Sequence, residues 1–189
     1  MSSVILTGDT SGTLTVSAPL VAGSNTVTLP AATGTISLLA QATAVASTSG
    51  TSIDFTGIPS WAKRITVMFQ GVSTNGSSQI QVQIGSGSVT TTGYLGAAFV
   101  TTNNANNSSG FLIGGTGSAT DVRHGIATIT LLGSNAFVFS FVGGYSNGAY
   151  TAYAGGSLGL SGALDRVRIT TVNGTDTFDA GSINVMWEG

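Results

Sequence analysis

The sequence predicts an all-β protein, in which a short N-terminal hairpin segment precedes an antiparallel β-sandwich. Three observations lead to this prediction. No stretch repeats apolar residues at the spacing of an amphipathic helix, and many short segments alternate apolar and polar residues as half-buried strands do. Turn-forming residues such as Asn-Gly separate these segments at short intervals. Many short strands with frequent turns are typical of a sandwich or barrel, here expected to be jelly-roll-like.

The first predicted elements lie in residues 1–41. Residues 13–17 and 26–29 alternate threonine or serine with apolar residues, and a small-Gly-Thr motif opens both 11–16 and 33–38. About forty residues with so few large side chains cannot build a hydrophobic core of their own. We therefore expect residues 1–41 to attach to, or intertwine with, another chain of a larger assembly.

Residues 42–189 form the predicted head domain, because they contain both tryptophans, all four tyrosines and all eight phenylalanines. These anchors suffice for a core between two sheets. Alternation predicts strands over 65–69, 79–84, 126–132, 138–142, 166–172 and 183–187. The phenylalanines at 137, 139 and 141 share one strand face and are expected in the core.

Turns and polar faces complete this prediction. Asn75-Gly76 and Asn147-Gly148 favour type I′ hairpin turns, whose central residues need positive φ. The segment 79–84 places three glutamines on the face opposite its apolar residues, and 103–109 is a polar tract expected to be an exposed loop. Arg166 and Arg168 share one face of a strand expected at a sheet edge, within reach of Asp54 or Asp165.

The charge content excludes several classes of protein. Five Lys+Arg against seven Asp+Glu give a net charge of −2, without the basic footprint of an ordinary nucleic-acid binder. A hydrophobic content of 41% is too high for a disordered chain, and no apolar run is long enough for a membrane span. A surface of neutral polar side chains suits close contact between copies, so we expect a symmetric homo-oligomer.

Catalytic and metal-binding patterns are weak, so we expect no enzyme, no cofactor and no metal. His124 is the single histidine, and no nucleophile motif accompanies it. Asp176 and Asp179 could supply two oxygen ligands to calcium, but a solvated turn is the favoured interpretation because no further ligand pattern follows. The glycine-rich segments 85–87 and 114–117 lack the lysine of a phosphate loop and predict tight turns.

A group of tyrosines forms the predicted contact site. Tyr145, Tyr150 and Tyr153 flank Asn147 near a predicted hairpin tip. Exposed tyrosines among asparagines and serines are common in binding surfaces, because they offer large contact area at low entropy cost. We expect these four residues to contact either a sugar receptor or a neighbouring subunit, and the sequence leaves both alternatives open.

The sequence also carries a resemblance. Residues 6–19, LTGDTSGTLTVSAP, and 23–35, GSNTVTLPAATGT, resemble a segment near the start of many tailed-bacteriophage fibre and other virion structural proteins. Residues 49–59, 63–67 and 178–188 are similar to terminal domains of phage tail-fibre-like proteins. The resemblance implies a homotrimeric appendage in the virion with a β-sandwich knob, held to other virion proteins through residues 1–41.

The resemblance leaves two structural roles in the virion open, and an enzyme is the remaining alternative. The head could bind a bacterial surface glycan as a short tail fibre, or the chain could be a capsid decoration or cement protein or a head fibre stabilising the particle. No shaft repeats separate the two regions, so fibre and decoration roles are hard to distinguish. A depolymerising tailspike enzyme is disfavoured, because acidic residues are few and no β-helix repeat is visible.

Overall fold

The computed structural model describes residues 3–7, 12–17, 37–101 and 103–189, which belong to two compact units divided between residues 36 and 37. In the first unit, β1 (Ser3–Thr7) pairs antiparallel with β2 (Thr13–Ser17). Ile5 and Leu6 point to opposite faces and both are exposed, so this described hairpin encloses no core. The strand predicted over 26–29 lies outside the described residues.

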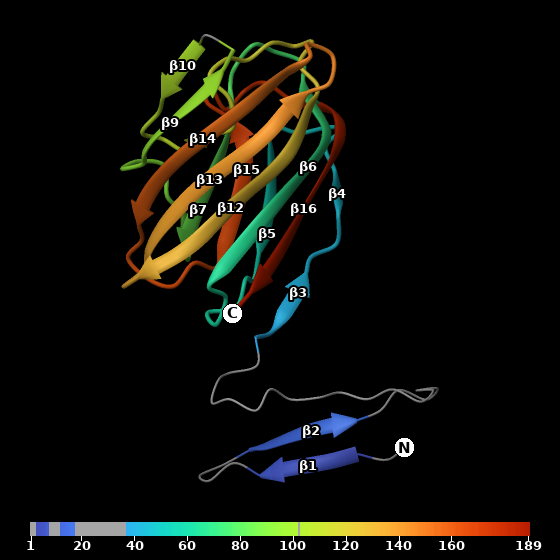
Figure 1. Cartoon of the computed structure of the whole chain (residues 1–189), viewed down its shortest axis with the longest axis vertical. Coiled ribbons are helices and arrows are strands. Elements are labelled where there is room, and N and C mark those ends of the chain that lie inside the picture. The colour runs from blue at the N-terminus through green and yellow to red at the C-terminus, as the bar shows by residue number, and fades with distance from the viewer. Residues whose placement is uncertain (1–2, 8–11, 18–36, 102) are drawn as a thin grey trace. The chain divides into compact units, whose positions relative to one another are not determined.

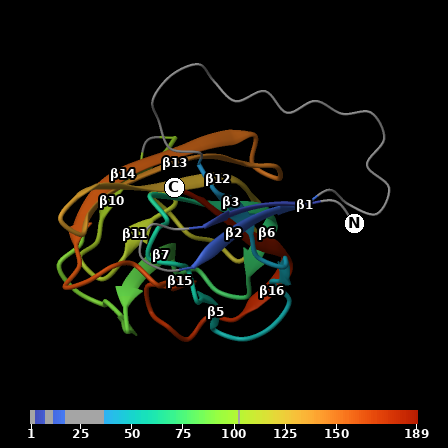
Figure 2. The same ribbon diagram turned by 90° about the horizontal axis from the view of Figure 1, so that it is seen from below.

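The second unit consists of two antiparallel sheets that face each other, which confirms the predicted all-β, sandwich-like fold (Figures 1 and 2). No helix occurs among the residues described. The larger sheet has nine strands: β10 (Asn103–Asn106), β9 (Leu95–Val100), β14 (Tyr150–Gly159), β13 (Ala136–Tyr145), β12 (Arg123–Gly133), β6 (Arg64–Thr74), β16 (Phe178–Glu188) and β3 (Leu39–Gln41) in that order, with β4 (Val45–Ala46) also paired to β16.

The smaller sheet has five strands: β11 (Phe111–Leu112), β7 (Ile80–Ser86), β15 (Arg166–Thr171) and β5 (Ser52–Thr56) in that order, with β8 (Ser88–Val89) paired to β7. β3 belongs to the larger sheet, because Ala40 pairs with Trp187 of β16. The boundary between the units therefore lies five residues before the expected one at 41/42.

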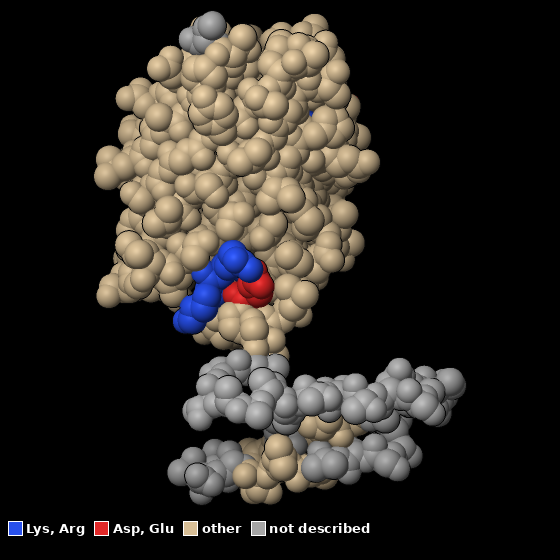
Figure 3. Space-filling view, in the orientation of Figure 1, with Lys and Arg blue, Asp and Glu red and all other residues tan. Residues whose placement is uncertain are grey.

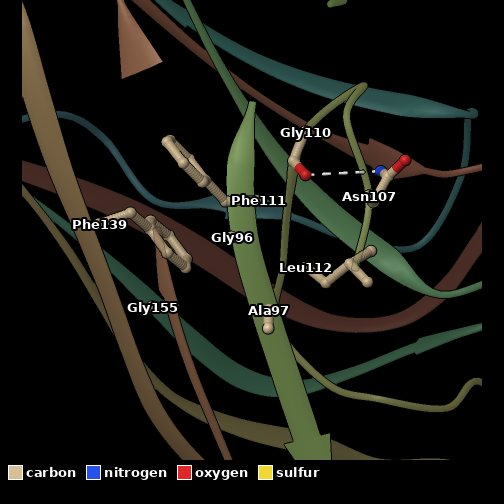
Figure 4. A pocket seen from close by; sticks show the side chains of 8 residues that line it. All are labelled: Gly96, Ala97, Asn107, Gly110, Phe111, Leu112, Phe139 and Gly155. Atoms are coloured by element: carbon tan, nitrogen blue, oxygen red, sulfur yellow. Dashed lines mark hydrogen bonds between the residues drawn. The ribbon is translucent and has the colours of Figure 1, made fainter. Parts of the chain in front are cut away.

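The core fills the space between the two sheets. Phe137, Phe139 and Phe141 are all buried, as predicted, and the ring of Phe139 stacks on that of Phe111 with centroids 4.5 Å apart. Glycines make this close packing possible, because a Cβ at Gly156 would lie 3.0 Å from the Phe111 ring. The hollow beside these rings, bordered by β9 and the 107–112 segment, is too small to admit a water molecule (Figure 4).

The face of β7 that carries the predicted glutamines is covered by a neighbouring segment. Gln81 and Gln83 are buried, since the 107–110 segment folds over them. The Gln81 carboxamide oxygen accepts a bond from Asn107 at 2.6 Å, and Gln83 donates to the Ser109 carbonyl at 2.7 Å. The polar tract expected to be an exposed loop thus forms the largely exposed strand β10 and a half-buried segment that is hydrogen-bonded to the glutamines.

The arginine strand is central and not an edge, because β15 pairs with β5 on one side and β7 on the other. The ion pairs expected for it are confirmed: Arg168 binds Asp54 and Arg166 binds Asp165, each with a shortest distance of 2.7 Å. These salt bridges place charge on the outer side of a fully paired strand.

Of the two predicted Asn-Gly turns, one connects a hairpin and the other does not. Asn75-Gly76 does not close a hairpin, since it follows β6 of the larger sheet and precedes β7 of the smaller one. The β13–β14 hairpin turns through residues 146–149, which contain the predicted Asn147-Gly148, although the positive φ falls on Ala149. The β12–β13 hairpin turns at Ser134 and Asn135, whose φ values of 48° and 61° suit a type I′ turn.

Candidate functional site

The four predicted contact residues do not form one surface. Tyr145 and Tyr150 are directly paired across the β13–β14 hairpin, with ring centroids 5.4 Å apart. Tyr145 is only 2% exposed, so the prediction that it is an exposed contact residue is wrong. Tyr153 follows Tyr150 by an odd number of residues, which turns it to the opposite face of β14, where it is 54% exposed.

Tyr145 is buried because it covers a buried ion pair. The carboxylate of Asp121 accepts a bond from Arg123 at 2.9 Å, and the guanidinium carbon of Arg123 lies 5.1 Å from the Tyr145 ring centroid. Burial raises the pKa of the Tyr145 phenol, against a smaller lowering by Arg123. This trio fastens the 120–123 segment to the end of β13 and leaves Tyr145 no exposed ring face.

Asn147 also has a structural role. Its side-chain oxygen accepts a bond from the Val122 amide at 2.9 Å, and its amide group donates to the Thr120 carbonyl. The β13–β14 loop is therefore tied to the preceding loop by both polar atoms of one side chain. Tyr150 remains as the exposed aromatic residue of the predicted group at this end of the sheet.

This hairpin lies at the end of the head opposite to the point where the chain enters. Tyr145 pairs with Arg123, and Arg123 pairs with Val72, at one end of the larger sheet. Glu188 pairs with Arg64 at the other end, beside Leu38, which exchanges backbone hydrogen bonds with Gly189. Figure 1 shows the β13–β14 connection and the C-terminus at opposite ends of the sandwich.

The neighbouring loops at the hairpin end are fastened by polar side chains. Asp176 accepts bonds from the Ser78 amide at 2.9 Å and from the Asn173 side chain at 2.7 Å, and these two bonds lower the pKa of its carboxyl, the Asn173 bond more strongly. Asp179 binds the Ser73 hydroxyl instead. The two aspartates thus have different partners, and among the described residues no group of three or more His, Cys, Asp or Glu could hold a metal ion.

His124 is not placed as a general base. Its Nδ1 accepts a bond from the Gly71 amide at 3.2 Å, so in the neutral ring Nε2 carries the proton. Nε2 lies 3.2 Å from the Ser146 hydroxyl and therefore donates to it. A histidine that donates to the serine oxygen cannot accept that serine's proton, in contrast to the arrangement of a catalytic triad.

The smaller sheet carries a polar hollow of about 330 Å³ on its outer side. Neutral hydrogen-bonding groups and one guanidinium line it, among them Gln83, Ser109, Arg168, Thr170 and Asn173. Thr170 and Arg168 are already bonded to Thr51 and Asp54. The lining offers amide and hydroxyl groups of the kind that bind sugar hydroxyls.

The outer face of the larger sheet is almost free of charge. None of β9, β13 and β14 contains Asp, Glu, Lys or Arg, and Arg64 pairs with Glu188 at one end of the sheet. Figure 3 shows this face, with most of the visible charged surface gathered at its lower edge. Tyr153 stacks on Phe99 here, with ring centroids 5.0 Å apart. Sequence reasoning missed this pair because it depends on which strands are neighbours.

No family model, curated protein or solved structure matches the chain. The likeness of the N-terminal segment to phage virion proteins therefore stays a prediction. Within the described part of the chain, no helix is long and apolar enough to cross a membrane.

Proposed function

We propose that the chain is a structural protein of a tailed-bacteriophage particle, without catalytic activity. It acts as a short, homotrimeric, tail-fibre-like appendage of the virion. Residues 1–41 bind other virion proteins, and the head contacts the surface of the host bacterium, where a glycan is the expected receptor. The resemblance of residues 6–35 to virion segments is one support for this proposal.

The observation that carries the proposal is the placement of the two ends of the head. The chain enters beside Leu38 and Gly189, whereas the Tyr150 hairpin lies at the far end of the same sheet. A head held to a particle through its N-terminal side would present the hairpin end to the surroundings. The loops there are braced by Asn147 and Asp176, and a preorganised surface binds with less loss of entropy.

The chemistry of the described residues is consistent with binding without catalysis. His124 donates to Ser146 and so is not available as its base. The polar hollow beside Gln83 and Asn173 offers neutral donors and acceptors, which suit a hydroxyl-rich ligand. A glycan in this hollow would be recognised by hydrogen bonds, whereas a glycan at the hairpin end would be recognised by stacking on Tyr150.

The second candidate function is a capsid decoration or cement protein, or a head fibre. The nearly uncharged face formed by β9, β13 and β14 favours it, because such a face suits lateral contacts with other subunits. Copy number separates the two candidates. Decoration requires hundreds of copies for each particle, whereas a tail appendage requires tens or fewer.

The test is to locate and count the chain on intact particles. Antibodies against the head, visualised by electron microscopy, should label the tail, and quantitative mass spectrometry should find tens of copies or fewer. Label over the capsid with hundreds of copies would favour the decoration role. A chain absent from purified particles would overturn both. Incubation with host polysaccharide should release no new reducing ends.

A further inference from the structure

The exposed face of the larger sheet carries a continuous row of apolar side chains across five strands. The pairing register places Phe99 beside Tyr153, Tyr153 beside Val142, Val142 beside Ile126, and Ile126 beside Met68. Directly paired residues of an antiparallel sheet lie on the same face. Val142 is 71% exposed and Ile126 52%, so the centre of this row faces the surroundings. We call these five residues the apolar row.

The apolar row ends in a polar residue on each side, and a row of small side chains runs next to it. Asn104 pairs with Phe99 at one end, and Asn184 pairs with Met68 at the other. The next row along the strands consists of small side chains: Ala97, Gly155, Ser140, Thr128 and Thr66. A ridge of large residues thus runs beside a furrow of small ones, and the polar ends resemble the rim of a protein interface.

We propose that this face, centred on the apolar row, is where copies of the chain meet. Another copy offers the matching shape, since the apolar row of each copy in a homotrimer can pack against the row of small side chains of the next copy around the axis. It also offers matching electrostatics, because two faces whose strands β9, β13 and β14 have no charged residues meet without desolvating ions. A strongly charged partner would find no counter-charge on these strands.

The size of the face fits a stable association. The five strands that carry the apolar row, β9, β14, β13, β12 and β6, contain 6, 10, 10, 11 and 11 residues. At a spacing of about 4.8 Å between strands and about 3.4 Å per residue, they cover on the order of 800 Å². This is about the area that each partner contributes to a standard protein interface.

The inference rests on the proposed function only in the expectation that the chain is a homo-oligomer, and it deepens that proposal by naming the contact. It also assigns Tyr153 to a neighbouring copy, whereas the sequence left a glycan open. Tyr150, on the other face of β14, is not part of the apolar row.

The test compares Val142→Lys with Val172→Lys in the full chain by sedimentation at micromolar concentration. Val172 is also exposed, but it lies outside the larger sheet. We expect the Val142 variant to self-associate about 30-fold more weakly or worse, and to sediment as the 18.8 kDa monomer. The Val172 variant should keep the oligomeric mass. Circular dichroism should show the same β-sheet content in both variants, because both replaced side chains are exposed and neither belongs to the core.

A second measurement does not depend on disrupting the assembly. The chain has no cysteine, so a Val142→Cys or Val172→Cys variant contains a single thiol. In the oligomer, a maleimide should label the thiol at 142 at least ten times more slowly than the thiol at 172. Equal labelling rates would overturn the proposed interface, whatever the symmetry of the assembly.

The outcomes separate this inference from the proposed function. An oligomeric wild type whose mass is unchanged by Val142→Lys would overturn the interface and leave the virion role standing. A variant that stays oligomeric but no longer adsorbs to host cells would mean that the host surface occupies this face, which also overturns the inference. A monomeric wild type would overturn the interface and the homotrimer together, whereas absence from particles would overturn only the virion role.

Discussion

Arg123 and Tyr145 are directly paired between β12 and β13, and the guanidinium of the first lies 5.1 Å from the ring centroid of the second, with both side chains almost fully buried. Asp121 balances the charge of Arg123. A charged pair inside the head explains why a tyrosine expected at a surface is covered. It also makes the stability of the hairpin end depend on a single carboxylate.

Replacing Asp121 by alanine should therefore destabilise the head by about 3–5 kcal/mol, because it leaves a buried guanidinium without a counter-charge. Chemical denaturation measures this loss. Asp54→Ala is the matched control, since the Asp54–Arg168 pair is partly exposed and worth about 0–1 kcal/mol. Equal losses in the two variants would contradict the structural role given to Asp121.

Gly114 allows the Tyr145 hydroxyl to approach its backbone, and a Cβ at this position would overlap that oxygen. Gly114→Ala should cost about 1–3 kcal/mol of unfolding free energy, as overpacking does. The cost should shrink in the Gly114→Ala, Tyr145→Phe double variant, because the overlapping atom is gone. Gly159→Ala, where a Cβ meets open space, should leave the packing intact. Additive effects of the 114 and 145 changes would refute the contact.

Because Tyr94 is buried, we expect the head to lose stability at alkaline pH. Burial raises the pKa of its phenol to about 12, against a smaller lowering by the hydrogen bond with Ile84. The unfolded tyrosine ionises near pH 10, so between about pH 10 and 12 the unfolded chain releases a proton that the folded one keeps. Stability should fall over this window by about 2–3 kcal/mol from this residue alone.

The measurement for Tyr94 is a series of denaturation curves from pH 8 to 12. Tyr94→Phe should start from a lower stability at pH 8, since the bond accepted from the Ile84 amide at 2.8 Å is lost. Above pH 10, the unfolding free energy of the variant should fall less steeply with pH, because its unfolding releases about one proton fewer. Identical slopes for wild type and variant would show that another group controls the alkaline loss.

Removal of residues 1–36 should leave the thermal midpoint of the head unchanged. All buried core residues found in the structure belong to residues 37–189, and Ile5, Leu6 and Val16 are exposed. Scanning calorimetry of the full and shortened chains tests this expectation. Under the proposed function, the shortened chain should also fail to enter particles. A lower midpoint would mean that the N-terminal unit contributes to the stability of the head.

Tyr150→Ala should weaken adsorption to host cells by about tenfold while leaving the oligomer intact, because Tyr150 is the partly exposed tyrosine at the far end of the head. Leu132→Ala is the control, since Leu132 is exposed at the opposite end of the same sheet. Competition between purified head and phage for cells measures the effect. Equal adsorption by both variants would remove Tyr150 from the contact site.

Local patterns in the sequence predicted the elements of the fold well. The alternation at 79–84 and 126–132 marked β7 and β12, and the three phenylalanines of β13 are buried as expected. Such patterns report which residues avoid water within one strand. They carry little information about what covers a strand from elsewhere, so the alternation at 79–84 does not reveal that residues 107–110 bury Gln81 and Gln83.

The candidate site was less predictable for the same reason. The side chain of Tyr145 is buried by Arg123 and Asp121, and only the pairing of β12 with β13 brings these groups together. The apolar row joins residues from five strands, so no single segment displays it. Both the burial of Tyr145 and the apolar row therefore depend on how strands that are distant in the sequence pair with one another. Tyr150 and Tyr153 were expected in one contact site, but because a single strand spans both, their odd separation puts them on opposite faces.

Leu38 and Gly189 exchange backbone hydrogen bonds of 2.9 and 3.2 Å, so the first and last strands of the head end side by side. A peptide genetically fused after Gly189 would therefore emerge next to the N-terminal connection and leave the opposite loops unobstructed. The same adjacency allows a circular permutant in which a short linker joins these ends and a new opening is cut at the Ser134-Asn135 turn. The permuted chain would keep all strand pairings of both sheets and would lose only the covalent turn between β12 and β13.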